Sequence, residues 1–129
     1  MSEKTGLKVV YFELKNRGYK NVLRNEFCSN PYEFISLLKN AEYVVTNSFH
    51  GTVFSIVFNK RFWTIPHTTR GSRMVDLLNK FELSGRIVHD LSEFMSKDYN
   101  GEIDYNVVNT LLEKEREKSM KWLLEALNS

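Results

Sequence analysis

Apolar residues follow two alternating patterns along the chain, short continuous runs and longer stretches with helical spacing. Runs of β-branched and aromatic residues, such as Tyr43-Val44-Val45, favour buried strands. Apolar residues three or four positions apart, such as Phe34, Leu37 and Ala41, favour amphipathic helices. We therefore expect strands over residues 8–14, 42–46, 61–65 and 86–88, and a second short strand within 19–27 is left open. We expect helices over residues 31–40, 51–58, 74–81, 91–95 and 104–127.

Capping residues support several of these boundaries. Asn30 suits the N-cap of the helix over 31–40, because Pro31 follows at the first helical position and Glu33 lies in the first turn. Asp104 is placed to cap the long last helix in the same way. Ser84-Gly85 is expected to end the helix that contains residues 74–81.

The alternation of strands and helices predicts the fold class. The strands are apolar throughout, which is typical of a parallel sheet covered by helices on both faces. We therefore predict one α/β domain over residues 1–129, a Rossmann-like three-layer arrangement with a mainly parallel sheet and a long C-terminal helix. The sequence contains no internal repeat, no low-complexity segment and no domain linker.

The last helix is apolar at both ends and charged in the middle. Val107 and Leu111 lie near its start, Trp122 and Leu127 lie near its end, and residues 113–118 are all charged. One interpretation is a surface helix that packs on the domain at two places, with a solvated middle. The alternative is that one apolar end reaches a neighbouring domain or subunit.

Composition narrows the class of protein. The chain of 129 residues has 42% hydrophobic and 26% charged residues and a net charge of +2, which is ordinary for a globular protein and too weakly basic to indicate nucleic-acid binding. The single cysteine, Cys28, excludes an internal disulfide and is expected to be inert. No apolar run is long enough to span a membrane. We expect a cytoplasmic protein, with peripheral association at the inner membrane face as an alternative.

The sequence Thr46-Asn47-Ser48-Phe49-His50-Gly51-Thr52 places a polar corner where a strand is expected to lead into a helix. In open parallel sheets, ligands bind beyond the carboxyl ends of the strands, and the free N–H groups of a helix N-terminus favour an anion. Gly51 would let a ligand approach the backbone, and His50 would supply a proton donor or acceptor near neutral pH. The alternatives are structural, with Asn47 or Ser48 as a helix cap and His50 as a core residue.

A second polar loop, residues 67–73, follows the strand over 61–65 and contains Arg70 and Arg73. Arg73 could hold a phosphate or carboxylate through two parallel hydrogen bonds. The loop could equally be an ordinary solvated connection. His89 has no partner in the sequence pattern, and no His, Cys and Asp cluster has the short spacing that zinc requires. No glycine-rich dinucleotide-binding or phosphate-binding fingerprint is present.

Residues 41–62, with Val44-Val45-Thr46-Asn47-Ser48-Phe49-His50-Gly51-Thr52 at their centre, resemble the polysaccharide pyruvyl transferase family. Members of that family often read A-x-x-V-V-T-[DN]-S-F-H-G-T-x-F-S-I-x-F. The flanking residues also agree, and the likeness extends over about residues 30–127. Other branches of the family carry an arginine two positions before the histidine, where this chain has Ser48. Positive charge for the donor would then come from Arg70 or Arg73.

The resemblance implies a fold like that of the two-Rossmann-domain glycosyltransferases, of which this chain would form the C-terminal half. It implies transfer of pyruvate from phosphoenolpyruvate to a sugar of a cell-surface polysaccharide, as a ketal, with no cofactor. His50 would act as acid or base or contact the donor, and the donor pocket would be lined by Asn47, Ser48, Gly51, Thr52, Arg70 and Arg73.

Three readings remain open at this stage. The chain could be half of a transferase whose cleft is completed by an N-terminal half-domain or a partner chain. It could be a non-catalytic Rossmann-like module that binds an anion. It could also be an assembly domain that forms a homodimer through its last helix.

Overall fold

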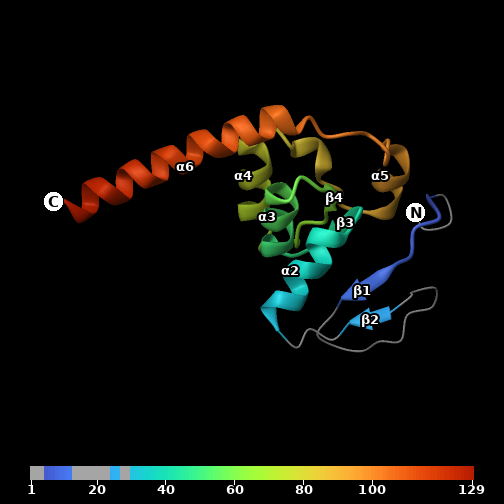
Figure 1. Ribbon diagram of the computed structural model, residues 1–129. Helices are drawn as coiled ribbons and strands as arrows, with labels where there is room; N and C mark the ends of the chain where they lie inside the picture. Colours follow the sequence, from blue (N-terminus) through green and yellow to red (C-terminus); the bar gives the residue numbers. More distant parts are fainter. Residues whose placement is uncertain (1–4, 13–23, 27–29) are drawn as a thin grey trace. The chain divides into compact units, whose positions relative to one another are not determined.

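The computed structural model describes residues 5–12, 24–26 and 30–129 (Figure 1). The chain divides into two compact units, residues 1–37 and 38–129. A single domain over residues 1–129 stays a prediction, because compact units are not by themselves separate folding domains. The expectations for Cys28 and for the ends of the first two strands lie outside the described residues.

The first unit contains a short parallel pair of strands and the start of a helix. β1 (Val10–Phe12) pairs with β2 (Arg24–Glu26), so a second short strand does lie within residues 19–27. α2 (Pro31–Asn40) has the bounds that its sequence predicts. The Asn30 side chain caps it by accepting a hydrogen bond from the Glu33 N–H at 3.0 Å.

The sheet of the second unit is parallel. β3 (Tyr43–Thr46) pairs with β4 (Arg61–Thr64), in a register that sets Val44 beside Phe62 and Thr46 beside Thr64. Thr64 also forms a parallel bridge to Ile87. The strand expected over 86–88 is otherwise absent, since Arg86 belongs to the 3₁₀ helix η1 (Ser84–Arg86).

The hydrophobic core lies on one face of this sheet. Val44 and Phe62 point to that face because side chains alternate along a strand. The buried cluster around them consists of Val44, Ile56, Phe62, Leu78, Phe81, Leu83, Ile87 and Val108. On the other face, Phe94 of α5 (Leu91–Ser96) packs edge-on against Trp63, whereas Val45 is exposed. The structure is therefore mixed α/β, and the Rossmann-like three-layer arrangement is not confirmed.

Two helices follow the two strands and begin and end at well-defined residues. α3 (Phe49–Val57) starts two residues earlier than expected, because Ser48 rather than a later residue is its N-cap. α4 (Ser72–Lys80) ends before Ser84-Gly85. Each helix is terminated by a residue with left-handed backbone geometry, Asn59 with φ 54° and Glu82 with φ 58°.

Close packing of α3 on β3 depends on Gly51. This residue is buried, and a Cβ atom at its position would lie 2.4 Å from Thr46 Oγ1. No side chain fits at that separation. Gly51 is therefore needed for the approach of the helix to the strand.

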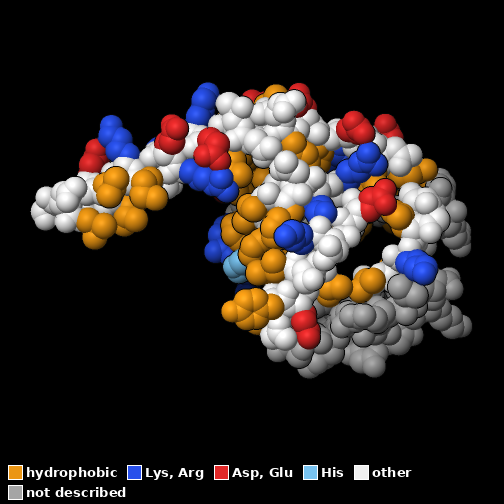
Figure 2. Space-filling model, viewed as in Figure 1, with side chains coloured by type: hydrophobic (Ala, Val, Ile, Leu, Met, Phe, Trp, Pro, Cys, Tyr) orange, Lys and Arg blue, Asp and Glu red, His pale blue; other side chains and the backbone are white. Residues whose placement is uncertain are grey.

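The long helix α6 (Tyr105–Leu127) is anchored by its first half, up to Glu115 (Figures 1 and 2). Asp104 caps it as predicted, and Val108 is buried. The Tyr105 hydroxyl donates to the backbone oxygens of Lys60 and Ser55, and burial raises the pKa of this phenol.

An ion pair between Lys80 and Glu115, 2.6 Å apart, follows two turns further along α6. The Lys80 hydrogen bond holds the pKa of Glu115 below its ordinary value. Every residue from Arg116 to Ser129 is exposed, so the interpretation of a helix docked at both ends is wrong. Among the described residues, no helix combines the length and the apolar character needed to cross a bilayer.

We expect Gly51→Ala to lower the free energy of unfolding by about 1–3 kcal/mol, because the new methyl group would force α3 away from Thr46. Urea unfolding followed by circular dichroism measures this change. Gly85→Ala is the matched control, since no atom lies within 4 Å of a Cβ atom there, and it should change stability by less than about 0.5 kcal/mol. Equal effects of the two substitutions would contradict the packing role of Gly51.

Candidate functional site

The carboxyl ends of β3 and β4 lie at one edge of the sheet, because the strands are parallel and in register at Thr46 and Thr64. The Ile65 N–H donates to the Thr46 oxygen at 2.9 Å and extends this pairing to the edge. α3 begins directly after β3, and the loop of residues 65–71 leads from β4 to α4. The two helix N-termini are thus brought to the same edge, which is where ligands bind in open parallel sheets.

Hydrogen bonds within the turn fix the N-terminus of α3. Ser48 donates its N–H to Thr46 Oγ1 at 3.0 Å, and its own Oγ accepts from the Gly51 N–H at 3.3 Å. Its backbone oxygen accepts from the Thr52 N–H at 3.0 Å. The N–H groups of Phe49 and His50 have no partner among the described residues. Two donors are therefore available at the positive end of the helix dipole.

Phe49 joins the two helix N-termini. The Arg73 guanidinium carbon, from the first turn of α4, lies 4.8 Å from the centre of the Phe49 ring. The His50 ring meets the same phenyl ring edge-on, with ring centres 5.9 Å apart. Phe49 is thus in contact with both a guanidinium, which lies over its ring, and an imidazole, which meets it edge-on. Phe49 was not among the predicted site residues, although it lies inside the motif, because its partner Arg73 is distant in sequence.

The remaining predicted site residues differ in how much of each side chain is exposed to solvent. Asn47, His50, Arg70 and Arg73 are exposed, and Ser48 is partly buried. Neither Arg70 nor Arg73 forms an ion pair with a carboxylate of the described residues. Exposed arginines without such a partner are suited to bind an anion.

Gly51 and Thr52 lie on the buried side of α3. The Thr52 hydroxyl donates to the Ser48 backbone oxygen at 3.0 Å and lies 3.1 Å from the Thr64 hydroxyl, which is also buried. The Thr52 hydroxyl therefore makes its hydrogen bonds inside the core and does not face a ligand. Gly51 provides the close approach to Thr46 rather than an open backbone for a ligand.

The other two described histidines lie outside this cluster of side chains. His67 is exposed, and its Nδ1 is 3.1 Å from the Thr69 hydroxyl of its own loop. His89 is also exposed, and its backbone N–H donates to Glu93 at the start of α5. In the described part of the chain, no three His, Cys, Asp or Glu side chains gather closely enough to hold a metal ion.

Arg86 lines a separate cavity of about 240 Å³ beside the start of α6. Its guanidinium stacks on the Trp63 ring with the carbon 4.9 Å from the ring centre, and burial lowers its pKa. Arg86 Nη1 and Trp63 Nε1 have no hydrogen-bond partner among the described residues, but both atoms are shielded from solvent. A ligand cannot reach these donors without movement of the chain, so the cavity is a weaker candidate.

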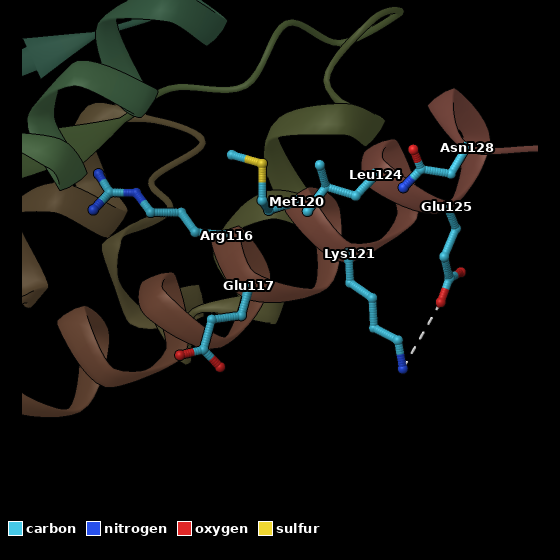
Figure 3. Close-up of a pocket in the computed structure, with 7 residues that line it drawn as sticks. All are labelled: Arg116, Glu117, Met120, Lys121, Leu124, Glu125 and Asn128. Atoms are coloured by element: carbon cyan, nitrogen blue, oxygen red, sulfur yellow. Dashed lines mark ion pairs between the residues drawn. The ribbon is translucent and has the colours of Figure 1, made fainter.

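A second hollow of about 780 Å³ lies along the distal part of α6 (Figure 3). All of the residues that line it come from this one helix, namely Arg116, Glu117, Met120, Lys121, Leu124, Glu125 and Asn128. It is therefore an open helix surface rather than an enclosed binding site.

A match to a protein-family model shows which family this chain belongs to. The model of the polysaccharide pyruvyl transferase family matches residues 2–69, which is more than half of the chain. The chain belongs to the polysaccharide pyruvyl transferase family. No curated protein and no solved structure matches the chain.

The family match includes β3, the N-terminus of α3 and β4, and it ends at Thr69. His50 and Phe49 therefore lie inside the matched region, whereas Arg70 and Arg73 lie beyond it. For this pyruvyl transferase family member, a transferase function is indicated by the family. The roles of individual residues stay predictions.

We expect Thr52→Val to destabilise the fold by about 1–2 kcal/mol, because it removes the acceptor of the buried Thr64 hydroxyl. In the double variant Thr52→Val, Thr64→Val, the loss should be smaller than the sum of the two single losses. Thermal unfolding of the three variants tests this coupling. Thr68→Val, in the exposed loop, is the matched control and should be close to neutral. Additive losses would contradict the direct contact.

Proposed function

We propose that this chain is a pyruvyl transferase-like domain that binds phosphoenolpyruvate at the N-terminus of α3 and contributes to the transfer of pyruvate to a sugar. The observation that carries the proposal is the pairing of two available backbone donors with His50 and Arg73 on the exposed edge of a family member. Both groups are linked through Phe49.

The chemistry of the donor suits such an edge. Phosphoenolpyruvate carries a phosphate and a carboxylate, and each is stabilised by helix N-terminal N–H groups and by guanidinium groups. The N–H groups of Phe49 and His50 would bind one anionic group, and Arg73 would bind the other. Arg70, Asn47 and Ser48 would add contacts from the same exposed edge.

We propose that His50 acts as the acid in the first step. It would protonate the methylene carbon of phosphoenolpyruvate, which leaves an oxocarbenium-like centre at the neighbouring carbon. One sugar hydroxyl would add to this carbon and give its proton back to the His50 imidazole. A second hydroxyl would then displace the phosphate and close the ketal, and its proton would leave with the phosphate as hydrogen phosphate. The anionic phosphate would be stabilised throughout by the donors at the helix N-terminus.

The acceptor side of the reaction requires further protein. We propose that this chain supplies one wall of the cleft, and that an N-terminal half-domain or a partner chain supplies the acceptor site. The pathway would be cell-surface polysaccharide biosynthesis, with the protein on the cytoplasmic side.

A second candidate function is a non-catalytic anion-binding module. The observation that favours it is the burial of Gly51 and Thr52, which leaves fewer side chains for the donor than the motif predicts. Ser48 also stands where other branches carry an arginine. Anion binding without turnover in the completed cleft would support this second candidate.

We expect phosphoenolpyruvate to raise the melting temperature by roughly 3–8 °C at concentrations of ten to a hundred times its Kd, because it binds the folded state. Differential scanning fluorimetry measures the shift, with phosphate and pyruvate as comparison ligands. His50→Ala and Arg73→Ala should each reduce it by more than about half.

His89→Ala is the matched control, since His89 is equally exposed and lies at the start of α5. It should leave the shift unchanged. Loss of the shift in this control, or its persistence in both site variants, would exclude the proposed binding site. A shift that is as large with phosphate alone would favour the anion-binding module.

A further inference from the structure

The distal part of α6, residues 116–127, carries large apolar side chains that none of the described residues covers (Figure 2). The exposed fractions are 57% for Met120, 70% for Trp122, 45% for Leu123, 51% for Leu124 and 72% for Leu127. Figure 2 shows hydrophobic side chains gathered along this end of the helix, with charged groups beside them. Such a contiguous apolar surface on a water-soluble domain marks an interaction site.

These side chains occupy one broad side of the helix. At 100° per residue, the arc from Trp122 through Leu123 and Met120 to Leu124 covers about 200°. Lys121 and Glu125 lie on the remaining side and pair with each other at 3.9 Å. Figure 3 shows Met120 and Leu124 on one side of the helix and the Lys121–Glu125 pair on the other. The helix is amphipathic here, although every residue from Arg116 onwards is exposed in the described part of the chain.

The acidic and basic side chains of this helix balance, so the helix has no net charge that would attract an oppositely charged partner surface. Residues 116–127 contain three basic and two acidic side chains, and the whole helix over 105–127 contains four of each, so the helix as a whole is neutral. An interfacial membrane helix is instead rich in Lys and Arg on its polar face. Two copies of a neutral helix approach each other without repulsion.

The exposed area is sufficient for a pair of copies. The five exposed fractions add up to about three complete large side chains, or on the order of 600 Å² at about 200 Å² each. A symmetric pair would remove at most about twice this area from water, or about 1,200 Å², which is the lower limit of stable protein interfaces and predicts a weak, concentration-dependent dimer.

We propose that two copies of this chain associate through the distal part of α6, with the apolar surface of residues 120–127 packed on itself about a two-fold axis. A two-fold interface uses the same surface on both copies, and the apolar segment and the neutral charge of this helix satisfy that requirement. The long projecting helix would then serve as the dimerisation element. This inference does not depend on the proposed transferase function.

Analytical ultracentrifugation of the full 129-residue chain, from about 1 µM to about 1 mM, tests the proposal. We expect a monomer–dimer equilibrium. Leu124→Glu should raise the dimer Kd at least roughly tenfold, because it places a charge in the apolar surface of both copies. Lys118→Gln, on the polar side of the same helix, changes the net charge by the same one unit as Leu124→Glu, so it is the matched control and should change the Kd by less than about threefold.

Tryptophan fluorescence provides a second measurement. Trp63 is buried and Trp122 is exposed, so a shift of the emission to shorter wavelength on concentration should disappear in Trp122→Phe. Circular dichroism should show unchanged helix content in each variant.

A monomer at the highest concentration, or a dimer that Leu124→Glu does not weaken, would overturn the proposal. So would a monomer whose α6 binds to vesicles of neutral and anionic phospholipid, since that result assigns the surface to a membrane.

Discussion

The contact between α3 and the two strands is the constraint on which the second unit depends. Gly51 lets the helix approach Thr46 more closely than any side chain would allow. One turn of the helix further along, the Ser55 hydroxyl donates to the Gly51 oxygen at 2.7 Å. Thr52 and Thr64 meet beneath the helix at 3.1 Å, where neither is exposed to water. A buried hydroxyl is costly unless it has a partner, so the Thr64 hydroxyl depends on Thr52, whose own hydroxyl also donates to the Ser48 oxygen.

This packing also determines what the N-terminus of α3 offers to solvent. A helix that buries Gly51 and Thr52 must turn His50 outwards, because neighbouring positions lie about 100° apart. Ser48 caps the helix, and its hydroxyl oxygen accepts the hydrogen bond of the Gly51 N–H. The N–H groups of Phe49 and His50 are then left without a partner among the described residues. The motif therefore combines two tasks in consecutive residues. One set holds the helix on the sheet, and the other set faces outwards with Arg73 of the next helix.

The sequence predicted those features that depend on neighbouring residues. The caps at Asn30 and Asp104 and the bounds of α2 were confirmed, because each is set by local hydrogen bonds. The ends of α3 and α4 were predicted within one residue, but both starts were predicted two residues late. The stop expected at Ser84-Gly85 was wrong, because Glu82 ends α4 with left-handed geometry and without a glycine. The burial of Thr52 and the contact between Phe49 and Arg73 both required the tertiary arrangement. Likewise, helical periodicity describes an apolar face of α6, but it does not identify the partner of that face.

α6 is attached to α3, the same helix that carries His50. The Tyr105 hydroxyl, at the start of α6, binds the backbone oxygens of Ser55 and Lys60 at the C-terminal end of α3. The same nine-residue helix thus presents His50 at its N-terminus and receives α6 at its C-terminus. Because α6 gains its buried contacts within its first turns and the Lys80–Glu115 pair follows, its direction is fixed before the apolar distal segment begins. A helix held at one end positions that segment away from the core of the second unit, where none of the described residues covers it.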